Sequence, residues 1–186
     1  MQQFSPSPAW DALHPFVIHF PIVLLLLSPM FIVISAILPP PRGKPYMMIA
    51  IYFLLLGTAS LFIARSTGKA AARVVERGGA LEVVLAAHQT FALQTVIVFS
   101  ELSVMLLVVA LLPRVLRRTE TRLFSTALPL TFLAFYFGGV VFLMNTSQTG
   151  GRLVHEFGAH AVFSKKTGPS LQPPATAVTR IGEDRQ

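Results

Sequence analysis

Cysteine is absent from the 186-residue sequence, and charged residues make up only 12% of it. The lack of cysteine excludes disulfides, thiolate metal sites, covalently attached c-type haem and cysteine-ligated iron–sulfur clusters. A soluble domain of this length would carry about a quarter charged residues. The shortage of charge, together with 53% apolar residues, therefore indicates a membrane protein.

Acidic residues are the scarcer charged class, with 8 Asp and Glu against 15 Lys and Arg. The resulting net charge of +7 is also found in nucleic-acid-binding proteins. In a membrane chain, however, Lys and Arg gather in cytoplasmic loops and at anionic lipid headgroups. We therefore expect contact with membrane lipid and no nucleic-acid partner.

Four apolar runs are long enough to cross a membrane as helices. We expect these spans at residues 15–38, 46–64, 81–112 and 123–144. The predicted fold class is all-α, an integral membrane four-helix bundle. Pro29 lies inside the first span, where it removes a backbone hydrogen bond and is expected to kink the helix.

Short interfacial helices are predicted beside the spans, at residues 66–81 and 152–163, where apolar and polar residues alternate at helical spacing. The prediction divides the chain into an N-terminal segment (1–14), a transmembrane domain (15–163) and a flexible tail (164–186). We recognise no internal repeat in the sequence.

The distribution of positive charge predicts the orientation. The connections after the first and third spans hold six cations, namely Arg42, Lys44, Arg114, Arg117, Arg118 and Arg122. The segment before the first span holds none. Because Lys and Arg accumulate in cytoplasmic loops, both termini are expected outside the cytoplasm.

All five histidines fall on the extracytoplasmic side of this topology: His14, His19, His88, His155 and His160. His19 and His88 are expected at similar depth, roughly 6–9 Å below the starts of their helices. Neutral imidazole is the usual axial ligand of b-type haem. The pattern predicts one or two haem b groups, with His19 and His88 as iron ligands and His14 with His155 or His160 at a second site.

Other roles for these polar residues stay open. A histidine at a helix start can cap backbone groups or form hydrogen bonds between helices. The same histidines also suit a metal ion without porphyrin. Glu101, in the third span, is expected to be a buried carboxyl, either hydrogen-bonded within the bundle or part of a proton path to a quinone.

Three motifs resemble one family of bacterial membrane proteins. They are His14-Pro15 followed by His19-Phe20-Pro21, then His88 early in the third span, then Gly150-Gly151-Arg152-Leu153-Val154-His155 ahead of Gly158. This pattern is similar to the proteins grouped as domain of unknown function 2231, over about residues 13–162. The resemblance implies a four-helix protein of the bacterial inner membrane. Some members resemble or accompany cytochrome components, and the family often has Tyr where this chain has His155.

The sequence and the resemblance together favour an electron-transfer subunit. We expect it to link a periplasmic redox partner, such as a c-type cytochrome or another subunit of a redox complex, with quinone or a larger membrane complex. Catalysis of its own is not expected. The alternatives are a cofactor-free subunit that anchors a membrane complex, and a membrane protein that binds a metal ion.

Overall fold

The computed structural model describes residues 10, 12–39, 41–75, 78–117, 121 and 123–159. These residues form helices and, among them, no strand, so the all-α prediction is confirmed. The elements are α1 (His14–Val17), α2 (His19–Ile37), α3 (Lys44–Val74), α4 (Gly79–Val115), the short π-helix η1 (Leu123–Ala127) and α5 (Leu128–His155).

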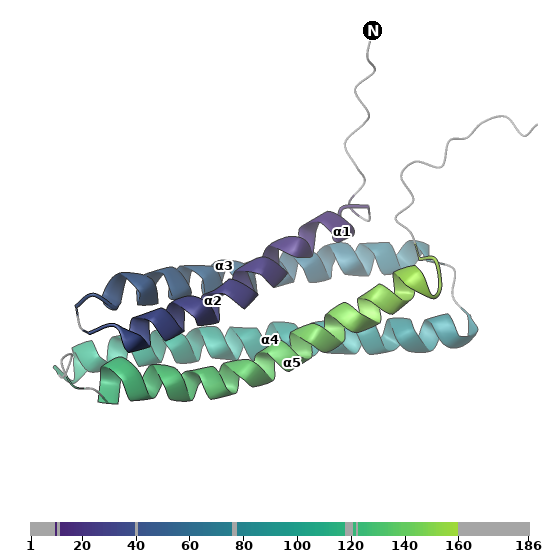
Figure 1. Ribbon diagram of the computed structural model, residues 1–186. Coiled ribbons are helices and arrows are strands. Elements are labelled where there is room, and N and C mark those ends of the chain that lie inside the picture. Colours follow the sequence, from purple (N-terminus) through teal and green to yellow (C-terminus); the bar gives the residue numbers. More distant parts are fainter. Residues whose placement is uncertain are drawn as a thin grey trace, which may run out of the picture.

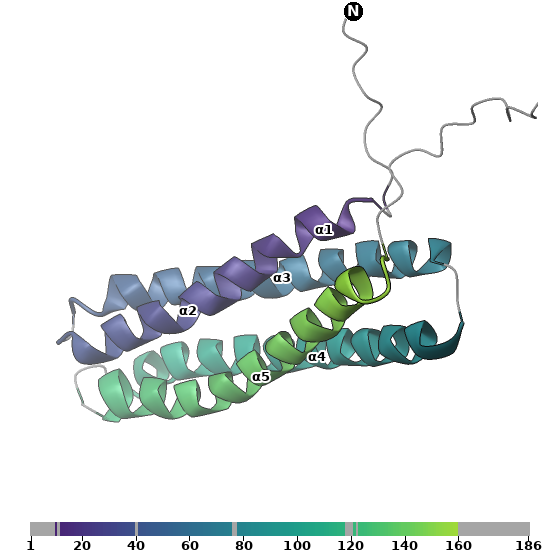
Figure 2. The same ribbon diagram turned by 45° about the vertical axis from the view of Figure 1, so that its right-hand side comes forward.

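Four helical segments are long and apolar enough to cross a membrane. They are His14–Ile37, Lys44–Arg73, Gly79–Val115 and Phe124–His155. The chain is therefore a multi-pass integral membrane protein. The four segments pack as two antiparallel hairpins, α2 with α3 and α4 with α5, and the first hairpin lies on the second (Figures 1 and 2).

Within the described residues, neither the interfacial helix predicted at 66–81 nor the described part, 152–159, of the one predicted at 152–163 forms a separate helix. Instead, α3 runs without a break to Val74, and α5 continues to His155. Thr67 and Ala72 are buried, and Ala72 packs with residues of α4 and α5. This packing holds the end of α3 in the bundle, where the sequence pattern alone predicted a helix on the membrane surface. The predicted second surface helix extends beyond the described residues.

Proline determines two local features of the first span. A proline has no backbone N–H, so Pro21 cannot donate to the carbonyl of Val17 four residues earlier. The helix is interrupted at this point, between α1 and α2. Pro29 likewise leaves the Leu25 carbonyl without its intrahelical donor. The hydroxyl of Tyr136, from α5, donates to that carbonyl at 2.6 Å, so the orphaned oxygen is satisfied from the other hairpin.

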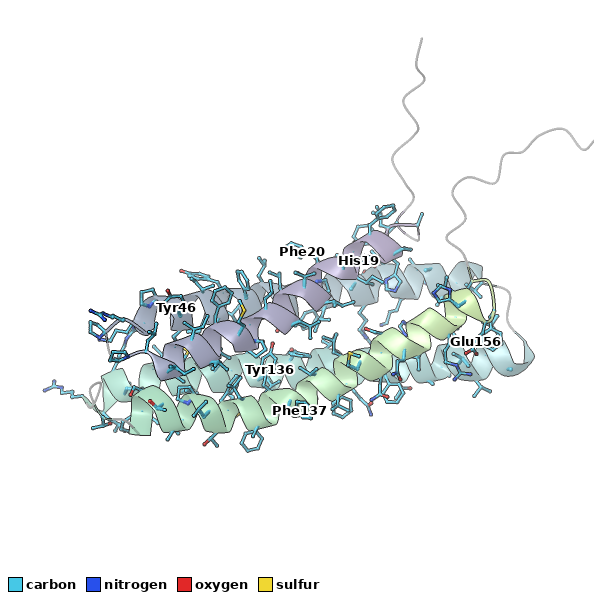
Figure 3. The ribbon with its side chains drawn as sticks, in the orientation of Figure 1. His19, Phe20, Tyr46, Tyr136, Phe137 and Glu156 are labelled. Atoms are coloured by element: carbon cyan, nitrogen blue, oxygen red, sulfur yellow. The ribbon has the colours of Figure 1, made fainter. Side chains whose placement is uncertain are left out.

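Aromatic side chains fill the centre of the bundle. Phe99, Phe132 and Tyr136 are almost fully buried. The Phe99 and Tyr136 rings meet edge to face with centroids 5.5 Å apart, and the Phe132 ring lies 5.8 Å from that of Tyr136. Figure 3 shows Tyr136 on the inner side of α5 and Phe137 on its outer side. This cluster ties α5 to both α4 and α2.

The two hairpins bury equivalent positions. In α2 the buried residues include Pro21, Leu25, Ser28, Ile32 and Ser35, and each residue 74 positions later is buried in α4: Thr95, Phe99, Leu102, Leu106 and Val109. In α3 they include Ala50, Leu54, Gly57 and Leu61, and the residues 82 positions later are buried in α5: Phe132, Tyr136, Gly139 and Leu143. The second offset is larger than the first because the connection between α4 and α5 is longer than the connection between α2 and α3.

Close contacts of two glycines repeat at the same offsets. A Cβ added to Gly57 would lie 2.8 Å from the Leu25 side chain, and one added to Gly139 would lie 3.4 Å from that of Phe99. The carbonyl oxygens of Leu25 and Phe99, which are 74 residues apart, both accept a hydroxyl hydrogen bond from the other hairpin, although the donors Tyr136 and Thr58 are not at equivalent positions. The hairpins are thus two equivalent halves related by an approximate two-fold axis along the bundle. The expectation of no internal repeat is wrong.

Candidate functional site

Two histidines from opposite halves meet at one end of the bundle. His14 belongs to α1, and His88 lies in the third turn of α4. Their ring centroids are 6.4 Å apart, with an interplanar angle of 75°. His88 follows His14 by 74 residues, the offset that relates the first helices of the two hairpins. The two imidazoles are therefore equivalent side chains that converge near the approximate two-fold axis.

The hydrogen bonds of His88 determine which ring nitrogen carries its proton. The Nδ1 atom lies 3.0 Å from the carbonyl oxygen of Thr146 and 3.2 Å from the hydroxyl of Thr149. A carbonyl oxygen only accepts, so Nδ1 must be the donor. This assignment, made from the hydrogen-bond network, leaves the Nε2 atom of the neutral ring with a lone pair.

His14 reaches the same state through a threonine of α3. Its Nδ1 atom lies 3.1 Å from the hydroxyl oxygen of Thr67. That hydroxyl donates its single hydrogen to a backbone carbonyl, at 2.9 Å from Ala64. It must therefore accept from Nδ1 of His14. Both imidazoles thus carry their proton on Nδ1 and keep the lone pair of Nε2.

A glycine follows each of these threonines and makes room for the ring. A Cβ added to Gly68 would lie 2.9 Å from Cε1 of His14, and one added to Gly150 would lie 3.1 Å from Cε1 of His88. Thr67-Gly68 and Thr149-Gly150 are separated by 82 residues, the offset of the second helices. Each half of the protein therefore supplies one histidine and one Thr-Gly step that holds it.

Sequence reasoning missed both Thr-Gly steps. The signal was present as Thr-Gly pairs near the ends of the second and fourth spans, each following its half's histidine at a similar distance. A Thr-Gly pair is too common to be recognised without the repeat.

The other histidines lie apart from this pair. His19 is exposed near the start of α2 (Figure 3), and His155 is exposed at the end of α5. His14, rather than His19, is the histidine beside His88. His160 lies outside the described residues. The ligand roles predicted for His19 and His155 stay predictions. Among the described ring contacts, neither residue lies beside another histidine.

An exposed ion pair closes the end of α5 next to His155. The Arg152 guanidinium donates to the carboxylate of Glu156 at 2.9 Å. This hydrogen bond holds the pKa of Glu156 below its usual value. The Glu156 carboxylate is thus paired with Arg152 on the surface of the bundle.

Glu101 does not lie in the core, contrary to the expectation of a buried carboxyl. It is exposed on the outer side of α4. The side chain that does enter the core nearby is Ser103, whose hydroxyl lies 3.0 Å from that of Thr58. The expected place of Glu101 in a hydrogen-bond network within this bundle is therefore wrong.

A cavity of about 200 Å³ lies at the opposite end of the bundle from the histidine pair. Its walls are mostly apolar, with Lys44 and Arg114 among the lining residues. The cavity is formed by the end of α2, the start of α3, the end of α4 and η1. It is thus separated from His14 and His88 by most of the length of the bundle.

The comparisons with known proteins give one match. A family model described as "Predicted membrane protein (DUF2231)" matches residues 10–162. No curated protein and no solved structure matches the chain. The family match covers all four membrane segments and both histidines of the pair.

Proposed function

We propose that this chain, which belongs to the DUF2231 family of predicted membrane proteins, is an electron-transfer subunit that binds one b-type haem through His14 and His88. The observation that carries the proposal is the pair of imidazoles whose Nδ1 atoms are both occupied as donors. Metal-binding histidines typically use their second ring nitrogen in this way, because the hydrogen bond fixes the tautomer and the ring orientation.

The number of protein ligands favours haem over a bare ion. Within the described residues, no group of three or more His, Asp and Glu side chains comes together as a metal site. Zinc sites in proteins normally use three or four protein ligands. Haem iron needs only axial ligands from the protein, since the porphyrin supplies four nitrogens. Two neutral imidazoles fit that requirement.

The separation of the rings also supports a shared metal. The ring centroids of His14 and His88 are 6.4 Å apart, which is short enough for one metal ion to reach a nitrogen of each ring at the usual bond length of about 2.0–2.1 Å. Haem bound there would supply one-electron transfer. The chain would hold it through one histidine from each hairpin, His14 and His88.

The orientation is part of the proposal. The end of the bundle opposite the histidines carries Arg42, Lys44, Arg114 and Arg117 without a described acidic residue. At the histidine end, cations are interspersed with Glu82 and Glu156. By the positive-inside rule, the proposed haem would lie near the periplasmic face of a bacterial cytoplasmic membrane. A periplasmic redox partner, such as a c-type cytochrome or another subunit, would reach it there, with quinone or a membrane complex as the second partner.

A metal ion without porphyrin is the second candidate. His14 and His88 are each packed closely against a glycine backbone, and the cavity described above lies at the other end of the bundle. A two-coordinate ion such as Cu(I) needs no more room than the present gap between the rings. Imidazole is an accepted ligand for copper.

One preparation distinguishes these candidates. The protein is purified from a host with adequate haem supply and analysed by pyridine haemochrome assay and elemental analysis. The haem proposal expects about one b-type haem and one iron per chain. Copper or zinc at that ratio without haem would establish the second candidate. A protein with neither would contradict both and leave an anchoring subunit as the function.

Neighbouring glycines provide a matched test of the site. Gly150→Ala is expected to displace His88 and weaken cofactor binding about tenfold or more, the usual loss when the support of a metal ligand is disturbed. Gly151→Ala adds the same methyl group to the same helix, but a Cβ there meets nothing within 4 Å. Cofactor titration of both variants checks the prediction. Equal affinities would show that the contact between Gly150 and His88 does not position the ring.

A further inference from the structure

The outer face of α4 carries two polar side chains that the bundle does not use. Gln94 and Glu101 are both exposed, and they are seven residues apart on the same face of the helix. No Asp, Glu, Lys or Arg occurs elsewhere at this depth: α2 has none, and neither do residues 45–64 of α3 or 128–151 of α5. This face of α4 therefore differs chemically from the rest of the surface that meets lipid.

Glu101 lies near the middle of the membrane segment. It falls between Phe99, which contacts Tyr136, and Ser103, whose hydroxyl contacts that of Thr58. These contacts mark the centre of the bundle, far from both of its ends. A carboxyl group that faces hydrocarbon at this depth is costly, charged or neutral, unless it has a hydrogen-bonding partner. The structure thus calls for a partner outside this chain.

The exposed residues around Glu101 follow a heptad spacing. Gln94, Glu101 and Val108 occupy one heptad position, and Ile97, Val104 and Leu111 occupy the other, and all six are exposed. Alternating steps of three and four residues form the contact face of a left-handed pair of helices. A shallow hollow lined by Ser100, Glu101, Val104 and Met105 lies on this face.

We propose that this face of α4 binds the same face of a second copy of the chain, so that the protein is a parallel homodimer with Glu101 paired to Glu101 of the partner. In a parallel two-fold pair, identical heptad positions face each other. A protonated carboxyl and a carboxamide each contain both a donor and an acceptor, so Glu101 and Gln94 are each complementary to themselves. A second copy therefore satisfies both groups at once, and it needs no additional cation.

Cross-linking in the membrane tests this contact directly, because the chain has no cysteine of its own. Val104→Cys and Ile97→Cys are introduced singly into the full-length protein and treated in native membranes with a short bismaleimide. We expect a covalent dimer of twice the monomer mass. Phe137→Cys is the control, since Phe137 is 70% exposed on α5 and lies level with the centre of the bundle. It should give little dimer.

The role of Glu101 is tested in the Val104→Cys background. Glu101→Leu removes the hydrogen bond, and we expect it to raise the dissociation constant of the dimer about three- to tenfold. Glu101→Gln keeps a self-complementary group and should stay near the parent value. Equal cross-linking at Val104 and Phe137, or an adduct with a different protein, would overturn the homodimer. A dimer unaffected by Glu101→Leu would overturn the proposed pairing of the carboxyl groups.

Discussion

Replacing either histidine of the pair should remove the cofactor. If the proposed haem site is correct, we expect His14→Ala and His88→Ala each to lose more than about 90% of the haem that the parent protein retains, because each would supply one of the two protein ligands of the iron. The measurement is the Soret absorbance per chain after purification, with the pyridine haemochrome assay as the check on haem content. Both variants should still be inserted in the membrane, since neither ring belongs to the central core.

Two further histidines provide the controls. His19→Ala and His155→Ala remove exposed imidazoles at the same end of the bundle and should leave the haem content unchanged. The sequence pattern predicted the opposite for His19, as the partner of His88. Loss of haem in His19→Ala with retention in His14→Ala would therefore support the sequence pairing and contradict the pairing seen in the structure.

Truncating the central tyrosine should cause the largest loss of stability. Tyr136→Ala removes a ring that is 1% exposed and leaves the Leu25 carbonyl, already without a donor because of Pro29, unsatisfied. We expect a loss of about 3 kcal/mol in the free energy of unfolding. This is near the low end for aromatic truncations, since transfer from water contributes little in a bilayer. Unfolding in mixed micelles, followed by circular dichroism, measures it.

Two variants separate the contributions of the Tyr136 side chain. Tyr136→Phe keeps the ring and removes only the hydrogen bond, so it should cost about 1–2 kcal/mol. Phe137→Ala removes an outward-facing ring of similar size and should cost less than about 1 kcal/mol. If Tyr136→Ala were no more destabilising than Phe137→Ala, the Tyr136 cluster would not be the centre of the fold.

Much of the fold follows from the sequence, because length and apolarity determine where spans can form. All four spans were predicted, and each overlaps its helix. The ends were predicted less well. Whether residues 66–74 leave α3 depends on Thr67 and Ala72, and both are buried by helices far away in the sequence. The hydropathy of residues 66–74 alone does not show that these distant helices pack against them.

The site was predictable only in part, for a geometric reason. The clustering of histidines at one end follows from topology alone, and His88 was identified. Choosing between His14 and His19 requires their direction around the helix, since residues five apart differ by about 140°. That direction depends on the break between α1 and α2 and on the Thr67-Gly68 step. Whether Glu101 faces outward depends in the same way on the rotation of α4 about its own axis. Because nearly all residues of this span are apolar, the sequence does not show which side of the helix faces the bundle.

The most direct test of the central claim is the low-temperature electron paramagnetic resonance spectrum of the oxidised, haem-loaded protein. If His14 and His88 bind one iron from its two sides, the spectrum should be that of low-spin ferric haem with two imidazole ligands. His14→Ala should then yield high-spin iron or no haem, while His19→Ala keeps the low-spin signal. A high-spin signal in the parent protein, or a low-spin signal that survives His14→Ala, would contradict the assignment of this pair.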